Sequence, residues 1–149
     1  MITKLGKQSL EKQIKDLQKE LDRTYKQRNE AAAEGDLKEN SAYIFMGERA
    51  GVLHSQIDEA LADLKEAVVQ SAPIQCESIS FGHKVSIFFE EDKRNLTITL
   101  VGKNDARLKQ DWISIQSPIG EALLGKKKSD KVTVNGNTVT ILDISIGEI

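Results

Sequence analysis

Apolar residues in the first part of the chain recur at intervals of three and four positions. One series runs Leu10, Ile14, Leu17 and Leu21 and continues more weakly through Tyr25, Arg28 and Ala32. A second series runs Met46, Ala50, Leu53, Ile57, Ala60, Leu64 and Ala67. This heptad spacing places each series along one face of an α-helix, as in coiled coils. We call these series the first and the second seam.

A break at Glu34-Gly35 separates the two seams. Two seams joined by a short break predict an antiparallel coiled-coil hairpin, because one amphipathic helix of this length would have no partner for its stripe. Each arm of roughly 26 to 28 residues would be about 40 Å long at ~1.5 Å per residue. Pairing of two chains through the same seams is the alternative. The break favours folding back, so we expect a monomer.

The second part of the chain alternates apolar and polar residues with the period of β-strands. Alternating apolar positions occur at Val85, Ile87 and Phe89, at Leu96, Ile98 and Leu100, and at Ile113 and Ile115. Val132 and Val134 face Val139 and Ile141 across Asn135-Gly136-Asn137, a strong signal for a tight hairpin. Ser117-Pro118 opens a short helix that continues over 119–124, with proline at the first helical position. The fold class predicted is α+β, with a small antiparallel sheet of four to six strands and a short helix.

The composition of the chain changes near Pro73, the first of two prolines. Good helix formers fill the chain up to Gln70, and β-branched residues with turn residues dominate afterwards. We therefore expect a coiled-coil hairpin over 1–72, a linker over 73–78 and an α+β domain over 79–149.

Charge and cysteine usage narrow the function classes. The 149 residues hold 21 basic and 23 acidic side chains, which argues against non-specific duplex binding through a basic face. A single Cys76 excludes an internal disulfide, and two histidines argue against a Cys/His zinc site. No stretch approaches the roughly 20 apolar residues of a membrane span, and no N-terminal apolar run follows a basic start. We expect a cytoplasmic protein without a membrane partner.

The break between the seams carries two acids, Asp36 and Glu39, three positions apart. If the second helix begins there, both carboxylates lie on one face and can converge. Convergent carboxylates suit Mg²⁺, which takes oxygen ligands and keeps several waters. Two protein ligands form a weak site that needs oxygens from another molecule. The same spacing is also that of a capping box, in which each residue satisfies the other's backbone N–H. Spacing alone leaves both interpretations open.

The stretch Gly35-Asp36-Leu37-Lys38-Glu39-Asn40-Ser41-Ala42-Tyr43 resembles the tip motif of the bacterial Gre transcript-cleavage factors, closest to the GreA type. Further stretches match this family in the same order and cover essentially the whole chain. They are Thr3-Lys4-Leu5-Gly6, Phe81-Gly82, Leu100-Val101-Gly102, Lys109-Gln110, Ile113-Ser114, Ser117-Pro118-Ile119 and Ala122-Leu123-Leu124-Gly125-Lys126.

The resemblance implies an accessory factor for bacterial RNA polymerase that has no small-molecule substrate and is not itself an enzyme. In that family the coiled coil enters the secondary channel, and an FKBP-like C-terminal domain docks at the channel rim. The matching residues here are Asp36 and Glu39 as catalytic acids and Ser117, Pro118 and Ile119 as polymerase contacts. The acids would share Mg²⁺ with the polymerase only in the complex, while the isolated chain binds no cofactor. They would orient the water that hydrolyses the backtracked transcript.

The same comparison places Lys38, Tyr43 and Arg49 near the 3′ end of the nascent RNA. Ala42 stands where another acid is common, and Gly47 stands near the usual place of an arginine. Alanines fill residues 31–33, where many members carry flanking cations. Because each lost phosphate contact weakens binding, the resemblance implies weak retention of RNA and short cleavage products.

Three other functions are weighed against transcript cleavage. A secondary-channel binder of the same shape would inhibit polymerase without supporting cleavage, and Ala42 together with the missing cations leaves room for it. A peptidyl-prolyl isomerase would need an aromatic-lined pocket, which the few aromatic residues of 75–149 disfavour. A purely structural spacer would leave the tip motif unexplained.

Overall fold

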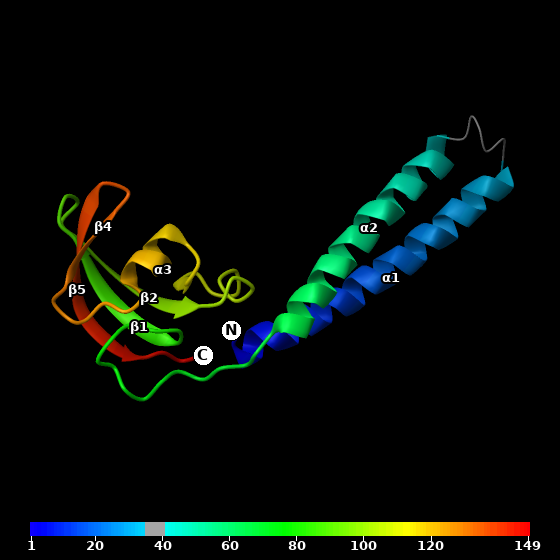
Figure 1. Ribbon diagram of the computed structural model, residues 1–149. Coiled ribbons are helices and arrows are strands. Elements are labelled where there is room, and N and C mark those ends of the chain that lie inside the picture. The colour runs from blue at the N-terminus through cyan, green and yellow to red at the C-terminus, as the bar shows by residue number, and fades with distance from the viewer. Residues whose placement is uncertain (35–40) are drawn as a thin grey trace. The chain divides into compact units, whose positions relative to one another are not determined.

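The computed structural model of the chain describes residues 1–34 and 41–149. It contains two compact units, one formed by residues 8–66 and the other by residues 1–7 together with 67–149. The first unit is a pair of long helices, and the second is a curled sheet with a short helix (Figure 1). The expected α+β fold class is confirmed.

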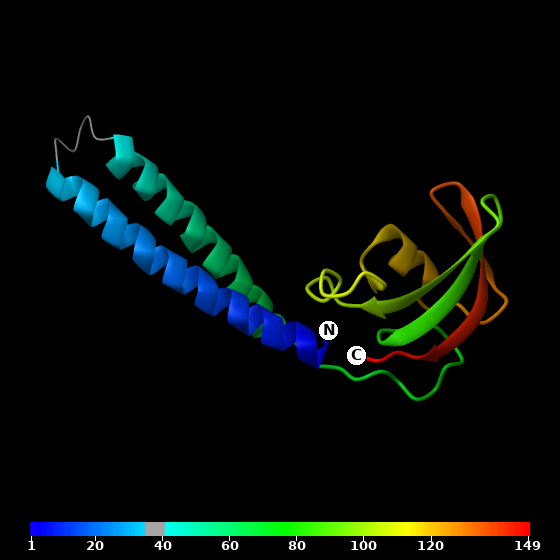
Figure 2. The ribbon, with the colours of Figure 1, turned by 180° about the vertical axis from the view of Figure 1, so that it is seen from behind.

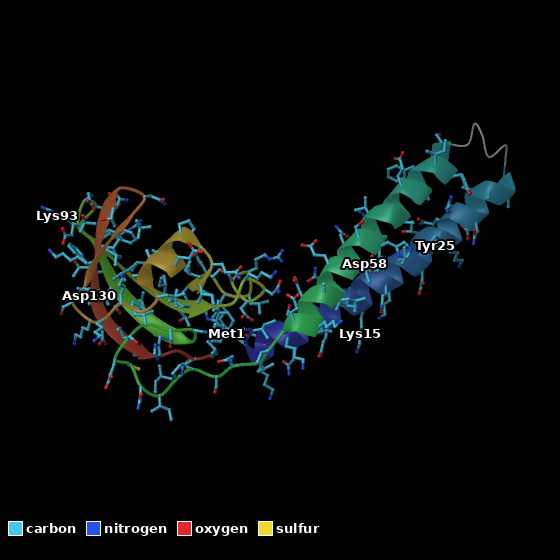
Figure 3. All side chains as sticks on the ribbon, in the orientation of Figure 1. Met1, Lys15, Tyr25, Asp58, Lys93 and Asp130 are labelled. Atoms are coloured by element: carbon cyan, nitrogen blue, oxygen red, sulfur yellow. The ribbon has the colours of Figure 1, made fainter. Side chains whose placement is uncertain are left out.

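The helical unit consists of α1, Lys4–Glu34, whose first turn belongs to the other unit, and α2, Ser41–Glu66. The two predicted seams bury their apolar side chains against each other. The buried members are Leu10, Ile14 and Leu21 of α1 and Ala50, Leu53, Ile57 and Ala60 of α2. Charged side chains such as Lys15 and Asp58 are exposed on the outside of the pair (Figure 3). The predicted helical hairpin is thus confirmed, with arms of 31 and 26 residues.

Five strands and one short helix form the second unit (Figure 2). They are β1 His83–Phe89, β2 Arg94–Val101, β3 Trp112–Ser114, α3 Pro118–Leu123, β4 Lys131–Val134 and β5 Asn137–Ile146. The strand order is β3-β2-β1-β5-β4, and every neighbouring pair is antiparallel except β2 and β3. The sheet is therefore as predicted apart from β3, which runs parallel to β2 because residues 102–111 carry the chain back before it pairs.

One large hydrophobic cluster of the sheet unit is aliphatic. Its buried members are Ile79, Val85, Ile87, Ile98, Leu100, Leu123, Val132, Val134, Val139, Ile141 and Ile144. The predicted hairpin between β4 and β5 closes through Asn135 and Gly136, both at positive φ. Positive φ at both central positions is the requirement of a type I′ turn. In the register observed, Val132 pairs with Val139, whereas Val134 pairs with Asn137.

The start of α1 is held by a buried carboxylate. Asp105 is fully buried and accepts hydrogen bonds from the Thr3 hydroxyl at 2.8 Å, from the Thr3 N–H at 3.1 Å and from the Gly102 N–H at 2.9 Å. The Thr3 hydroxyl in turn accepts from the Gly6 N–H at 2.9 Å, as an N-cap residue does. A negative charge at this position also complements the helix dipole. We call Thr3, Gly6, Gly102 and Asp105 the root cluster.

The root cluster leaves no room for side chains on its two glycines. A Cβ on Gly6 would overlap the Oδ1 atom of Asp105, and a Cβ on Gly102 would overlap the carbonyl oxygen of Met1. This explains physically why the chain carries glycine in Thr3-Lys4-Leu5-Gly6 and in Leu100-Val101-Gly102.

Residues before α1 are also paired with the strand-like segment after α2. The Ile2 N–H donates to the Val68 carbonyl at 3.0 Å, and the Gln70 N–H donates to the Ile2 carbonyl at 2.9 Å. Ile2 and Val69 form a parallel β-bridge. Because the Ile2 side chain is buried as well, the N-terminus is an integral part of the sheet unit.

Buried His83 forms a hydrogen bond to Pro73, the first residue of the predicted linker. Its Nδ1 accepts from the Ser80 N–H at 3.1 Å, and its Nε2 lies 3.2 Å from the Pro73 carbonyl oxygen. A backbone N–H can only donate and a carbonyl can only accept, so this pattern requires the neutral tautomer with the proton on Nε2.

We expect Asp105→Ala to lower the free energy of unfolding by about 2 to 4 kcal/mol, because each buried N–H left unsatisfied costs about 1 to 3 kcal/mol. Urea denaturation followed by circular dichroism measures the loss. Asp92→Ala removes an exposed carboxylate from the same unit and serves as the control. Equal stability of Asp105→Ala and Asp92→Ala would contradict the role given to the root cluster.

Gly6→Ala should also lower the free energy of unfolding, because its Cβ would overlap Asp105. Gly51→Ala, where a Cβ meets open space, should stabilise α2.

Candidate functional site

The acids expected to act at the tip lie in residues 35–40, which we call the tip segment. Asp36, Lys38 and Glu39 fall outside the described residues, so their roles as metal-binding, capping or RNA-proximal residues stay predictions. The tip segment joins the end of α1 to the start of α2. The described residues next to it show what supports it.

Tyr43 lies in the first turn of α2 and contacts an arginine of α1. The Arg28 Nη2 donates to the Tyr43 hydroxyl at 2.9 Å, and the Arg28 Cζ lies 4.3 Å from the centre of the Tyr43 ring. A guanidinium at this distance from an aromatic ring gains a cation–π attraction in addition to the hydrogen bond. Arg28 and Tyr43 therefore connect the two helices close to the tip segment.

Arg49, the other described residue expected near RNA, forms an ion pair with Glu20 across the hairpin. Both side chains are about 40% exposed, so solvent screens the pair and its contribution to stability is small. Arg49 also lines an open groove between the helices with exposed Phe45. The Arg49 charge is thus partly neutralised in the free protein.

A third polar contact joins the helices farther from the tip segment. The Tyr25 hydroxyl lies 2.6 Å from the His54 Nε2, and the two rings are 5.9 Å apart. Tyr25, Arg28 and Glu20 of α1 thus each meet a polar partner on α2. Such cross-helix contacts fix the register of a helical pair whose seam is otherwise apolar.

The segment expected to contact polymerase begins the short helix α3. Ser117 is the N-cap residue, and its hydroxyl accepts from the Gly120 N–H at 3.1 Å and donates to the Ser114 carbonyl at 2.6 Å. Pro118 occupies the first helical position and is exposed, whereas Ile119 is half-buried against the sheet core. Of these three residues, Pro118 is the one freely available to a partner, while Ser117 already holds the helix start.

Sequence reasoning missed Arg28 as a residue of the site. It stands at a position of the first seam, where heptad spacing alone predicts a weak continuation of the apolar series. A basic residue at a seam position signals a specific partner on the opposite helix. In an antiparallel hairpin of this length, that partner lies near Tyr43.

Among residues 1–34 and 41–149, no group of three or more His, Cys, Asp or Glu side chains is placed to hold a metal ion. In the same part of the chain, no helix is both long and apolar enough to cross a membrane.

Comparisons with known proteins match both units. A family model described as "Transcription elongation factor, N-terminal" matches residues 1–69, and one described as "Transcription elongation factor, GreA/GreB, C-term" matches residues 74–146. The transcription elongation factor GreA of Maridesulfovibrio salexigens is 36% identical over 135 residues, which cover 90% of this chain and 84% of that protein. GreA of Nitratidesulfovibrio vulgaris strain DP4 is 35% identical over 130 residues, covering 82% and 80%.

Two solved structures are also similar to this chain over part or most of its length. The crystal structure of GreA factor homolog 1 from Thermus thermophilus has 23% identity and a TM-score of 0.45, covering 96% of both chains. A GreA/GreB elongation factor from Nitrosomonas europaea has 26% identity and a TM-score of 0.42, covering 66% of this chain and 92% of that one.

The matches to both family models, together with the helical hairpin and the sheet unit, define the class of protein as a transcription elongation factor. The chain belongs to the GreA/GreB family, and the resemblance seen in its sequence is confirmed.

We expect Ser117→Ala to lower the free energy of unfolding of the sheet unit by about 1 kcal/mol, the usual cost of losing an N-cap side chain. Ser117→Thr keeps a hydroxyl and should recover most of this loss. Thermal unfolding of both variants against the wild-type protein measures the effect. If alanine and threonine behave alike, the capping role of Ser117 is wrong.

Proposed function

We propose that this chain binds bacterial RNA polymerase through the secondary channel and stimulates cleavage of backtracked nascent RNA, in the cytoplasm and as a monomer. The observation that carries the proposal is membership of the GreA/GreB family along both units, combined with Asp36 and Glu39 between the two helices. The helical hairpin supports it, because such a hairpin is a narrow carrier for a short acidic segment.

The chemistry of the acids fits a site completed by a partner. Carboxylate oxygens are the ligands that Mg²⁺ prefers, and two of them leave most coordination positions for other groups. A second Mg²⁺ in a polymerase would help generate the attacking water and stabilise the leaving oxygen of the RNA phosphodiester. Asp36 and Glu39 would help hold this Mg²⁺ and orient the attacking water. Lys38 and Tyr43 would lie near the RNA 3′ end.

The sheet unit would contribute affinity for the polymerase. Exposed Pro118, held at the start of α3 by the Ser117 cap, presents a rigid apolar contact. Rigid contacts lose little conformational freedom on binding, which favours affinity. In this scheme the sheet unit docks and the helical hairpin delivers the acids.

The test of the acids uses stalled, backtracked polymerase complexes with saturating factor and Mg²⁺. We expect Asp36→Ala and Glu39→Ala to bind polymerase as the wild-type protein does and to cut RNA about a hundredfold more slowly, the scale of a lost electrostatic contact at a reacting centre. Competition binding against labelled wild-type protein supplies the affinity. Equal cleavage rates for wild-type protein and Asp36→Ala would contradict the proposed mechanism.

The same assay separates cleavage from inhibition. A wild-type protein that competes for the polymerase, slows elongation and yields no cleaved RNA would be an inhibitory channel binder. Gel lengths of the released RNA also test the expectation of short products.

We expect Pro118→Ala to weaken polymerase binding about tenfold, which corresponds to about 1.4 kcal/mol. Thr133→Ala, at an exposed position of β4, is the matched control and should bind normally. Both variants should cleave at the wild-type rate once the factor is saturating, because the tip segment is unchanged. Unaltered affinity of Pro118→Ala would remove this residue from the polymerase contact.

A further inference from the structure

Arg28 is a charged residue of the first seam near the end of α1, at a position where an apolar residue would pack better. Arg28 lies on α1 less than two turns before that helix ends at Glu34. Its guanidinium stacks 4.3 Å from the centre of the Tyr43 ring and donates a 2.9 Å hydrogen bond to the Tyr43 hydroxyl. Both residues of the contact therefore lie within two turns of the ends of their helices.

Gly47 of α2 faces the Arg28 guanidinium. A Cβ built on Gly47 would lie 3.4 Å from the Arg28 Nε, Cζ and Nη2 atoms. The guanidinium thus occupies the surface that a larger residue at position 47 would cover. By contrast, Gly51, one turn farther along α2, has nothing within 4 Å of its Cβ position.

The arrangement is not optimal for stability. The Arg28 Nε is buried and finds no acceptor among residues 1–34 and 41–149. A buried donor without a partner lowers stability, and an apolar side chain of similar size would avoid that cost. The register of the helices is already supported by the Tyr25–His54 contact and the Glu20–Arg49 ion pair. Stability and register therefore do not explain the choice of arginine at this position.

We propose that Arg28 is a positioning residue of the cleavage reaction: it ties α1 to Tyr43 in the first turn of α2 and thereby fixes the geometry of the two helices between which Asp36 and Glu39 stand in the sequence. This inference rests on the proposed function. Orientation of reacting groups strongly affects rate, so a contact that holds both helices in one geometry would affect cleavage.

The main variant is Arg28→Met, which keeps an unbranched apolar stem and removes the charge, the hydrogen bond and the unsatisfied Nε. Arg23→Met is the matched control, because Arg23 is an exposed arginine of the same helix. We expect Arg28→Met to melt no lower than Arg23→Met and to compete for polymerase equally well. At saturating factor it should cleave RNA at least about tenfold more slowly, since a displacement of about 1 Å can cost a hundredfold in rate.

Tyr43→Phe tests the pair from the other helix. It keeps the ring and removes the hydroxyl that accepts from Arg28. We expect a smaller loss of cleavage than for Arg28→Met, and we expect the double variant to be no slower than Arg28→Met alone, because contacting residues are not additive. Full additivity of the two losses would show that the residues act independently, which overturns the proposal.

Two further outcomes also overturn it. One is wild-type cleavage by Arg28→Met at saturating factor. The other is a lowered melting temperature and polymerase affinity of Arg28→Met, with cleavage restored at saturation, which would make Arg28 a structural residue only.

A measurement without polymerase keeps this inference distinct from the proposed function. In ¹H–¹⁵N spectra of the free protein, the buried Arg28 Nε–H should exchange with solvent more slowly than that of exposed Arg23. Equal exchange would overturn the contact itself. If the contact is present and the wild-type protein cleaves no RNA, the proposed function fails while the geometry of the pair stands.

Discussion

The buried carboxylate of Asp105 is the interaction on which the architecture depends most. It satisfies the N–H and hydroxyl of Thr3 and the N–H of Gly102, and it places negative charge at the start of α1. A charge buried this deeply is tolerated only when it is fully hydrogen-bonded. The 31-residue helix α1 therefore begins at a fixed point inside the sheet unit, although most of its length belongs to the helical unit. The two units share one continuous element, and a single carboxylate determines where that element starts.

Features set by neighbours along the chain could be predicted, and features set by distant partners could not. The seams follow from heptad spacing, and the β4–β5 turn follows from Asn135-Gly136, because both depend on local geometry. The parallel pairing of β3 depends on the path of residues 102–111, which carries no periodic signal. The bond between Thr3 and Asp105 joins positions 102 residues apart. No local sequence pattern predicts a contact over this separation.

The same distinction applies to the candidate site. The acids Asp36 and Glu39 could be named from the sequence because a family motif surrounds them. Arg28 could not, since its role depends on its contact with Tyr43 across the hairpin. Ser117 shows the reverse case: a residue singled out for a partner also has a full structural task as a helix cap. A motif match alone does not separate these two roles.

The pairing of Ile2 with the segment after α2 bears on how the chain can be divided into fragments. The sheet unit is discontinuous in sequence, since it needs residues 1–7 as well as 67–149. A fragment that starts after the helices would lack the buried side chain of Ile2 and would leave the Asp105 carboxylate without Thr3. A short loop that replaces residues 8–66 and joins Lys7 to Ala67 would retain both. All residues of the sheet unit are therefore retained only when the helical hairpin is excised from the middle of the chain, and a cut at a single boundary does not retain them.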